Sequence, residues 1–170
     1  MIERSLAVLQ GLFAEVLISS NDPAPYRHYQ VPVISDERTG QGPISGLQAG
    51  LTAASLDPVF FVACDMPFII GQAISHLFQF ALAHDVVVPM AADGRLHPLH
   101  AFYGKACLPL IERNLRERHL KIIDFYPECR VKYVLEEELA QFGDPTRFLC
   151  NVNTPAEWQA ILAAEVQSRL

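Results

Sequence analysis

The stretch that decides the fold is VFFVACDMPF, residues 59–68. It opens with six consecutive apolar residues, ends that run on the carboxylate of Asp65, and turns at Pro67. A strand that is apolar on both faces is typical of a sheet covered by helices on both sides. An acid at the end of such a strand indicates a ligand site, because open α/β sheets bind ligands beyond the carboxyl ends of their strands.

Strands and helices alternate along the chain on both sides of this stretch. From apolar spacing we expect helices over residues 2–14, 43–55, 71–84, about 104–117, 120–126, 135–142 and 155–170. We expect further strands over residues 15–19, 30–34, 85–90, 96–103, 130–134 and 147–152. This alternation predicts parallel βαβ units. The sequence therefore predicts an α/β fold, a three-layer αβα arrangement around a doubly wound, mostly parallel sheet, in one domain over residues 1–170.

Composition excludes several classes of function. The net charge of −6 argues against general nucleic-acid binding, which requires a basic surface. No apolar run is as long as a membrane span, and no charged and then apolar leader opens the sequence, so we expect a cytoplasmic protein without a membrane partner. The four cysteines have no CxxC spacing, which argues against a zinc site.

Asp65 has two interpretations from its position alone. A carboxylate there can hold Mg²⁺ against a phosphate, since Mg²⁺ prefers oxygen ligands and takes part of its shell from the substrate. Alternatively, Asp65 caps the following helix through backbone N–H groups, as aspartates often do, or only forms a turn. Asp36 follows the predicted strand 30–34 in the same way, and its alternative is an ordinary loop acid.

Two further segments lie at the ends of predicted elements, one at the end of a strand and the other at the start of a helix. Asn151 lies near the end of the predicted strand 147–152, and Asn153 is the residue that follows it. These two asparagines either contact a ligand or form a turn with a helix cap. The glycines of the segment 40–46 either let the backbone approach a ligand at a helix N-terminus or form a plain loop. The common placement of these segments favours a single binding site.

Four motifs in this order resemble a known family. They are GPISGLQAGL (42–51), FFVACDMPFI (60–69), LHPLHAFY (96–103) and FLCNVNTPAEW (148–158). Over about residues 2–160 the chain resembles the molybdenum cofactor guanylyltransferases of the MobA type. The family joins GTP to molybdopterin and releases pyrophosphate, and the resemblance implies this Mg²⁺-dependent reaction here.

The resemblance implies roles for residues on the nucleotide side. Asp65 matches the aspartate that binds Mg²⁺ and bridges the nucleotide phosphates, and Asp36 matches an acid that contacts the guanine nucleotide. Ser19 stands where the family has an asparagine, and Asn21 matches a second one. We expect one of these two residues to meet the nucleotide.

It also implies roles on the pterin side. His97 matches the histidine of the HP element that lines the cleft, and Asn151 and Asn153 match asparagines near the pterin, with Asn153 also near the metal. Arg118 and Lys121 match a basic segment that meets the pterin phosphate, and guanidinium groups suit phosphate oxygens. The partners implied are small molecules, with transient contact to molybdenum cofactor synthesis proteins and to acceptor molybdoenzymes.

One difference from the family stands at the start of the sequence. Family members open with a strand and a glycine-rich loop, LAGGxSxRMGxDK, that cradles the triphosphate. This sequence opens at MIERSLAVLQ, which resembles the helix after that loop. We expect the strand and the loop to be missing from the sequence as printed, and GTP to bind poorly without them.

The reaction implied is in-line attack of the terminal phosphate of the pterin on the α-phosphorus of GTP. A metal ion at Asp65 would neutralise charge that develops on the oxygens. Two alternatives stay open: a related cytidylyltransferase or sugar-phosphate nucleotidyltransferase, and a non-catalytic accessory protein that binds molybdopterin.

Overall fold

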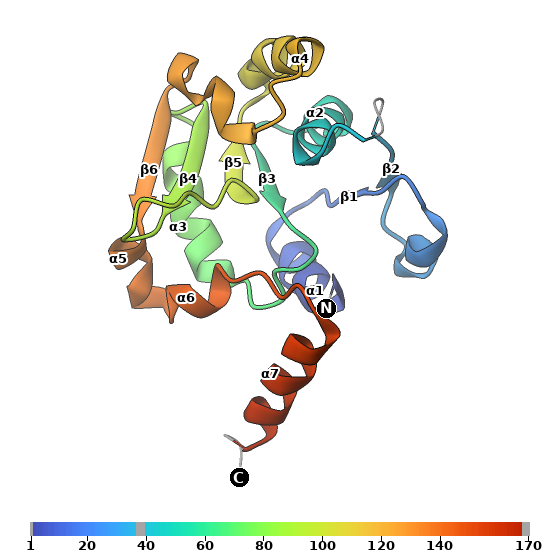
Figure 1. Ribbon diagram of the computed structural model, residues 1–170, viewed down its shortest axis with the longest axis vertical. Helices are drawn as coiled ribbons and strands as arrows, with labels where there is room; N and C mark the ends of the chain where they lie inside the picture. The colour runs from blue at the N-terminus through green and yellow to red at the C-terminus, as the bar shows by residue number, and fades with distance from the viewer. Residues whose placement is uncertain (1, 37–39, 168–170) are drawn as a thin grey trace.

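The computed structural model describes residues 2–36 and 40–167 (Figure 1). Its α-helices are α1 Ile2–Leu12, α2 Pro43–Ala53, α3 Gly71–Ala81, α4 Leu108–Glu117, α5 Glu136–Leu139, α6 Pro145–Phe148 and α7 Pro155–Gln167. Its strands are β1 Ile18–Ser19, β2 Val33–Ile34, β3 Val59–Val62, β4 Val86–Met90, β5 His100–Tyr103 and β6 Val131–Leu135. Short 3-10 helices are η1 Ala24–Tyr29, η2 Lys105–Cys107, η3 Ile122–Glu128 and η4 Ala140–Phe142. None of these helices combines the length and the apolar character that crossing a membrane would require.

The strands form two sheets. The main sheet has the order β3-β5-β4-β6, in which β5 is antiparallel to both of its neighbours and β4 is parallel to β6. β1 and β2 form a separate parallel pair. The reversal of β5 follows from the short connection 91–99, because a parallel neighbour would need a crossover of about a dozen residues.

Helices cover both faces of the main sheet, as predicted. On one face Val86 and Val88 of β4 pack with side chains of α2, α4 and η3, among them Leu47 and Phe125. On the other face Val87 packs with side chains of α3 and α6. Successive residues of β4 therefore point into opposite cores, which is the side-chain alternation of a strand buried on both faces. The three-layer α/β architecture is confirmed.

The prediction of a strand over residues 147–152 is wrong. Residues 145–148 form α6, whose N-cap Asp144 accepts a hydrogen bond from the backbone N–H of Thr146 (2.9 Å). Proline at the first helical position suits this start, since its missing N–H would be unpaired there. Phe148 and Leu149 are buried against the α3 side of the sheet, which explains an apolar run that is not a strand.

The other predicted elements are present, although most of the strands are shorter and the helix expected over residues 120–126 is the 3-10 helix η3. The predicted strands 15–19 and 30–34 reduce to the two-residue pair Ile18–Ser19 and Val33–Ile34. The last predicted helix begins at residue 155 as expected, and its residues 168–170 lie outside the described part of the chain.

Candidate functional site

A cavity of about 570 Å³ lies between the two sheets. We call it the inter-sheet cavity. Its walls come from α1, α2, the segment around β1 and the segment around β3. Four predicted site residues line it, namely Ser19, Asn21, Asp36 and Asp65. The structure therefore brings together the two acids that the sequence placed after separate strands.

Hydrogen bonds hold the carboxylate of Asp36. Ser45 Oγ donates to Oδ2 (2.7 Å) and Ser19 Oγ donates to Oδ1 (3.3 Å). The backbone N–H of Asp36 donates to Asn21 Oδ1 (3.0 Å). A Cβ on Gly46 would lie 3.4 Å from Ser19 Oγ, so glycine lets α2 come close to this group. These hydrogen bonds fix the orientation of the Asp36 carboxylate beside the first turn of α2.

Ser45 is a site residue that the sequence analysis missed. Its side chain is fully buried in the first turn of α2, and it makes the shorter of the two hydroxyl contacts to Asp36. The available signal was its place in the segment 40–46, where only the glycines were considered.

Asp65 has one oxygen held and one oxygen without a partner. Asn151 Nδ2 donates to Oδ2 (2.9 Å), and the backbone N–H of Val152 donates to the carbonyl of Asp65 (2.7 Å). Oδ1 is buried and accepts no hydrogen bond from the described residues. A buried carboxylate oxygen without a partner is costly, and a cation is a fitting ligand for it.

The helix-capping interpretation of Asp65 is wrong. The next helix, α3, begins at Gly71, and its N-cap is Ile70, which makes no side-chain cap. Asp65 therefore does not supply the missing cap, and its carboxylate is directed to Asn151 and the inter-sheet cavity.

The two asparagines of the NVN segment differ in their contacts. The side chain of Asn151 binds Asp65, whereas the backbone N–H of Asn153 donates to the carboxylate of Glu157 (2.8 Å). Thr154 Oγ1 accepts from the backbone N–H of Glu157 (3.2 Å), so Thr154 caps α7 as the sequence indicated. Asn151 is thus hydrogen-bonded directly to Asp65, the candidate metal ligand. A ligand role for the side chain of Asn153 stays a prediction.

His97 lies beyond the carboxyl end of β4. Its backbone N–H donates to the carbonyl of Pro89 (3.1 Å). Burial lowers the pKa of its imidazole, and the positive charge of Arg95 lowers it further, against the opposing charges of Glu136 and Asp93. The ring is therefore neutral near pH 7. His97 is at the same edge of the sheet as Asp65 but does not line the inter-sheet cavity.

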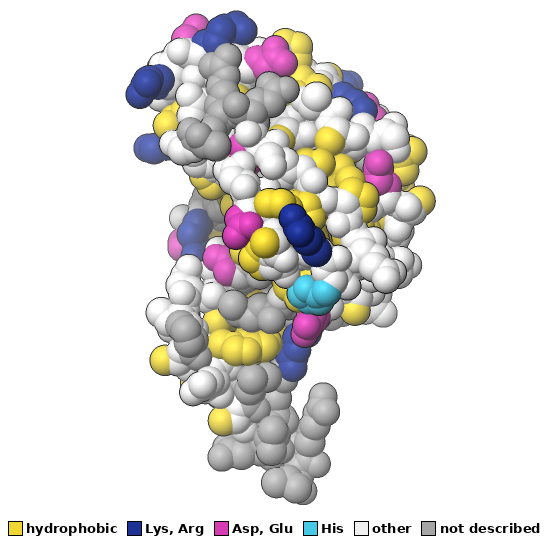
Figure 2. Space-filling model, turned by 90° about the vertical axis from the view of Figure 1, so that its right-hand side faces the viewer, with side chains coloured by type: hydrophobic (Ala, Val, Ile, Leu, Met, Phe, Trp, Pro, Cys, Tyr) yellow, Lys and Arg dark blue, Asp and Glu magenta, His cyan; other side chains and the backbone are white. Residues whose placement is uncertain are grey.

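Arg118 and Lys121 lie apart from the inter-sheet cavity. Arg118 is the left-handed C-cap of α4, and Lys121 precedes η3; both are exposed. Basic and acidic side chains are mixed at the end of the molecule that carries α4, the upper part of Figure 2. The structure does not join these two residues to Asp36 and Asp65.

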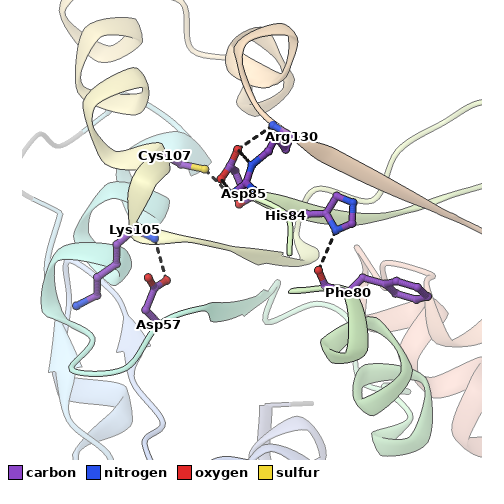
Figure 3. Close-up of polar contacts among 7 residues, drawn as sticks. All are labelled: Asp57, Phe80, His84, Asp85, Lys105, Cys107 and Arg130. Atoms are coloured by element: carbon purple, nitrogen blue, oxygen red, sulfur yellow. Dashed lines mark hydrogen bonds and ion pairs between the residues drawn. The ribbon is translucent and has the colours of Figure 1, made fainter. Parts of the chain in front are cut away.

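A second polar cluster lies at the opposite end of the sheet (Figure 3). Asp85 precedes β4, and Arg130 binds both of its carboxylate oxygens, at 2.8 Å from Nη2 and 3.2 Å from Nε. These hydrogen bonds lower the pKa of Asp85. The carbonyl of Asp85 accepts from Cys107 Sγ (3.3 Å). These contacts tie Arg130, just before β6, and Cys107, at the end of η2, to the start of β4.

No group of three or more histidine, cysteine or acidic side chains that could hold a metal ion occurs within residues 2–36 and 40–167. A site that relies on Asp65 fits Mg²⁺ nevertheless, because Mg²⁺ is often held by one or two carboxylates together with water and substrate phosphates.

The chain matches a family model described as the MobA-like NTP transferase domain, over residues 1–128. A probable molybdenum cofactor guanylyltransferase of Pelotomaculum thermopropionicum is 40% identical over 157 residues, which cover 92% of this chain and 76% of that protein. A second protein with that description, from Carboxydothermus hydrogenoformans, is 35% identical over 95% of this chain and 81% of its own length.

Solved structures share the fold. The molybdopterin-guanine dinucleotide biosynthesis protein A of Archaeoglobus fulgidus superposes with a TM-score of 0.81 at 24% identity, over 99% of this chain and 86% of that chain. The 2-C-methyl-D-erythritol 4-phosphate cytidylyltransferase of Thermus thermophilus superposes with a TM-score of 0.66 at 19% identity, over 99% and 88%. Both similarities show that this chain shares the fold of those structures.

Proposed function

Because the chain belongs to the MobA-like NTP transferase domain family, we propose that it transfers GMP from GTP to molybdopterin and releases pyrophosphate. The observation that carries the proposal is the convergence of Asp36 and Asp65 on one cavity, with a buried oxygen of Asp65 that has no partner. Relatives at 40% and 35% identity that are described as guanylyltransferases support the choice of reaction.

Asp65 is the proposed ligand of Mg²⁺, through Oδ1. Asn151 fixes the carboxylate by its hydrogen bond to Oδ2, which leaves the buried Oδ1 without a partner among the described residues. When bound, Mg²⁺ would neutralise charge on the nucleotide phosphates during transfer. The side chain of Asn153 is proposed beside it, two residues along the same turn.

Asp36 is the proposed contact of the guanine base. Guanine carries N–H donors on its edge, and a carboxylate can accept about four hydrogen bonds. Two of these go to Ser19 and Ser45, which leaves acceptor capacity on both oxygens for a base. Asn21 and Ser19 line the same part of the cavity and are proposed as further nucleotide contacts.

The pterin side of the proposal rests on the family resemblance. His97, Asn151 and Asn153 are proposed contacts of the pterin, and Arg118 and Lys121 are proposed contacts of its phosphate. We also propose that the reaction takes place in the cytoplasm, with transient contact to cofactor synthesis proteins and acceptor molybdoenzymes.

The test is a product analysis with both nucleotides. The protein is incubated with molybdopterin, Mg²⁺ and either GTP or CTP, and pyrophosphate and the dinucleotide are measured by an enzyme-coupled assay and mass spectrometry. Guanine dinucleotide formed with equimolar pyrophosphate supports the proposal. A product with CTP alone would replace it with cytidylyl transfer, and molybdopterin binding without pyrophosphate would replace it with an accessory role.

A further inference from the structure

The turn that follows β3 carries Asp65 and closes on a hydrogen bond from the backbone N–H of Met66 to the carbonyl of Ala63 (3.1 Å). Met66 itself is buried, with 2% of its surface exposed. Buried backbone carbonyls need partners, and those of Asp65 and Met66 find theirs in other parts of the chain. The position of the Asp65 carboxylate therefore depends on segments outside the turn.

Two distant segments supply these partners. The backbone N–H of Val152 donates to the carbonyl of Asp65 (2.7 Å). From the other end of the sequence, Ser5 Oγ of α1 donates to the carbonyl of Met66 (3.0 Å). Asn151, next to Val152, holds the carboxylate of Asp65 (2.9 Å). The helix α1 and the segment after α6 thus hold two consecutive residues of the turn.

Ser5 is a buried polar residue, with 4% of its surface exposed, and it lines the inter-sheet cavity as Asp65 does. Alanine is a better helix former than serine and fills a similar volume, so neither helix formation nor packing requires a serine at this position. A buried hydroxyl is costly without a partner, and the carbonyl of Met66 is the partner of this one. Its contact with the turn therefore explains the hydroxyl.

The residue before Ser5 contacts the same segment from its exposed side. Cζ of Arg4 lies 5.8 Å from the ring centroid of Phe68 and 5.1 Å from that of Trp158, where α1 lies beside the start of α7 (Figure 1). Cζ of Arg147 lies 4.8 Å from the ring centroid of Phe68. Cation–π contacts at exposed positions are weak, so we expect the buried hydrogen bond of Ser5 to have the larger effect on the turn.

We propose that Ser5 is a positioning residue for the metal-binding carboxylate of Asp65. Its hydrogen bond fixes Met66, and that of Val152 fixes Asp65 itself, so the partnerless Oδ1 is held in place before a cation arrives. A ligand that is already in position loses less freedom when the cation binds. Ser5 acts through the backbone of the turn. The inference rests on the metal role of Asp65 in the proposed function and adds a residue to it.

The first measurement is amide hydrogen exchange by NMR, without nucleotide or metal. In Ser5→Ala the backbone N–H of Val152 should exchange about 10-fold faster, because the turn that accepts its hydrogen bond loses a support. Ser5→Thr keeps the hydroxyl, and the inter-sheet cavity beside it has room for the added methyl group, so exchange should return to the wild-type rate. Thr52→Ala is the matched control, since it removes a hydroxyl that donates to the carbonyl of Gln48 within α2 (2.8 Å).

The second measurement is a titration with Mn²⁺ alone, which suits the same oxygen ligands as Mg²⁺ and broadens the NMR signals of nearby groups. In the wild-type protein the signals of Asp65 and of the Asn151 side chain should broaden. Ser5→Ala should raise the Kd for Mn²⁺ about 10-fold, the lower end of the loss seen when a residue that supports a metal ligand is removed. Ser5→Thr and Thr52→Ala should bind Mn²⁺ as the wild-type protein does.

The outcomes separate this inference from the proposed function. An unchanged Mn²⁺ affinity in Ser5→Ala, unchanged exchange at Val152, or a Ser5→Thr variant as impaired as Ser5→Ala would each overturn the role of Ser5 while leaving Asp65 as the metal ligand. A wild-type protein whose Asp65 signal does not broaden with Mn²⁺ would overturn the metal role of Asp65, and the positioning role of Ser5 together with it.

Discussion

At the scale of single residues, the two carboxylates of the inter-sheet cavity differ in how their oxygens are held. Both oxygens of Asp36 accept from serine hydroxyls, whereas Asp65 has one oxygen bound to Asn151 and one without a partner. A carboxylate with both oxygens oriented suits a base with N–H groups. A carboxylate with a bare buried oxygen suits a cation, and this difference supports the separate roles proposed for the two acids.

Asp65→Asn tests the metal role. The substitution keeps the size of the side chain and removes its charge, so the metal loses its anionic ligand. We expect kcat/KM to fall at least about 100-fold, the scale seen when one electrostatic contact to the transition state is lost. The melting temperature should change little. Mg²⁺-dependent turnover at the wild-type rate would remove Asp65 from the reaction.

Asn151→Ala tests positioning of Asp65. Without the amide donor at 2.9 Å, the carboxylate can rotate, and loss of such a supporting contact typically weakens metal binding roughly 10-fold to 100-fold. The expected change is a higher Mg²⁺ concentration for half-maximal turnover, with kcat largely recovered at saturating Mg²⁺. Thr146→Ala, on the neighbouring α6 and away from Asp65, is the control. An unchanged Mg²⁺ dependence would argue for a merely structural amide.

Ser45→Ala and Ser19→Ala compare the two hydroxyls on Asp36. Ser45 is fully buried with a 2.7 Å contact, and Ser19 is exposed with a 3.3 Å contact. Loss of the buried hydrogen bond should cost about 1–3 kcal/mol in the free energy of unfolding, and loss of the exposed one less. Urea titration measures both variants. Equal destabilisation would contradict the difference in burial.

At the scale of elements, the sequence correctly predicted the helix starts that are marked by a capping residue or by proline. Gly42-Pro43 predicted the start of α2 and Thr154 the cap of α7, because each acts through local backbone chemistry. The prediction of a strand over residues 147–152 is wrong because a short apolar run has the same pattern in a strand and in a buried helix. Asp36 and Asp65 were found from their positions after strands. The pairing of Asn151 with Asp65 was not, because it joins residues 86 positions apart.

β5 contains a buried histidine that makes stability depend on pH. His100 is fully buried beside Phe60 and Phe148, and its ring nitrogens have no partner among the described residues. Burial lowers its pKa to about 3. The unfolded chain, with an ordinary histidine pKa, binds a proton first as the pH falls, so stability decreases between about pH 6.5 and pH 3.

His100→Leu should therefore remove one source of acid sensitivity. The wild-type protein should lose about 1.4 kcal/mol per pH unit more than the variant below pH 6.5, because a single proton separates the two states. Urea unfolding at pH 7 and pH 5 measures the difference. His119→Leu, at an exposed histidine, is the matched control and should behave as wild type. Parallel loss of stability in all three proteins would contradict a buried neutral His100.

At the scale of the whole molecule, an acidic protein binds anionic substrates. The net charge is −6, and among the described residues those that line the cavity include Glu15, Asp36 and Asp65 but no lysine or arginine. A triphosphate entering this space meets repulsion unless a cation comes with it. Metal should matter for nucleotide binding itself, in addition to its part in the chemistry.

Removal of Mg²⁺ should therefore weaken GTP binding at least about 10-fold, which corresponds to about 1.4 kcal/mol. Fluorescence titration with a labelled GTP, in Mg²⁺ and then in EDTA, measures the effect. Asp65→Asn should bind GTP with little dependence on Mg²⁺, because its ligand for the ion is lost. Asp93→Asn removes the same charge from an exposed turn outside the cavity, so it should keep the full dependence on Mg²⁺. If both variants lost the dependence equally, net charge and not a metal ligand at Asp65 would govern binding.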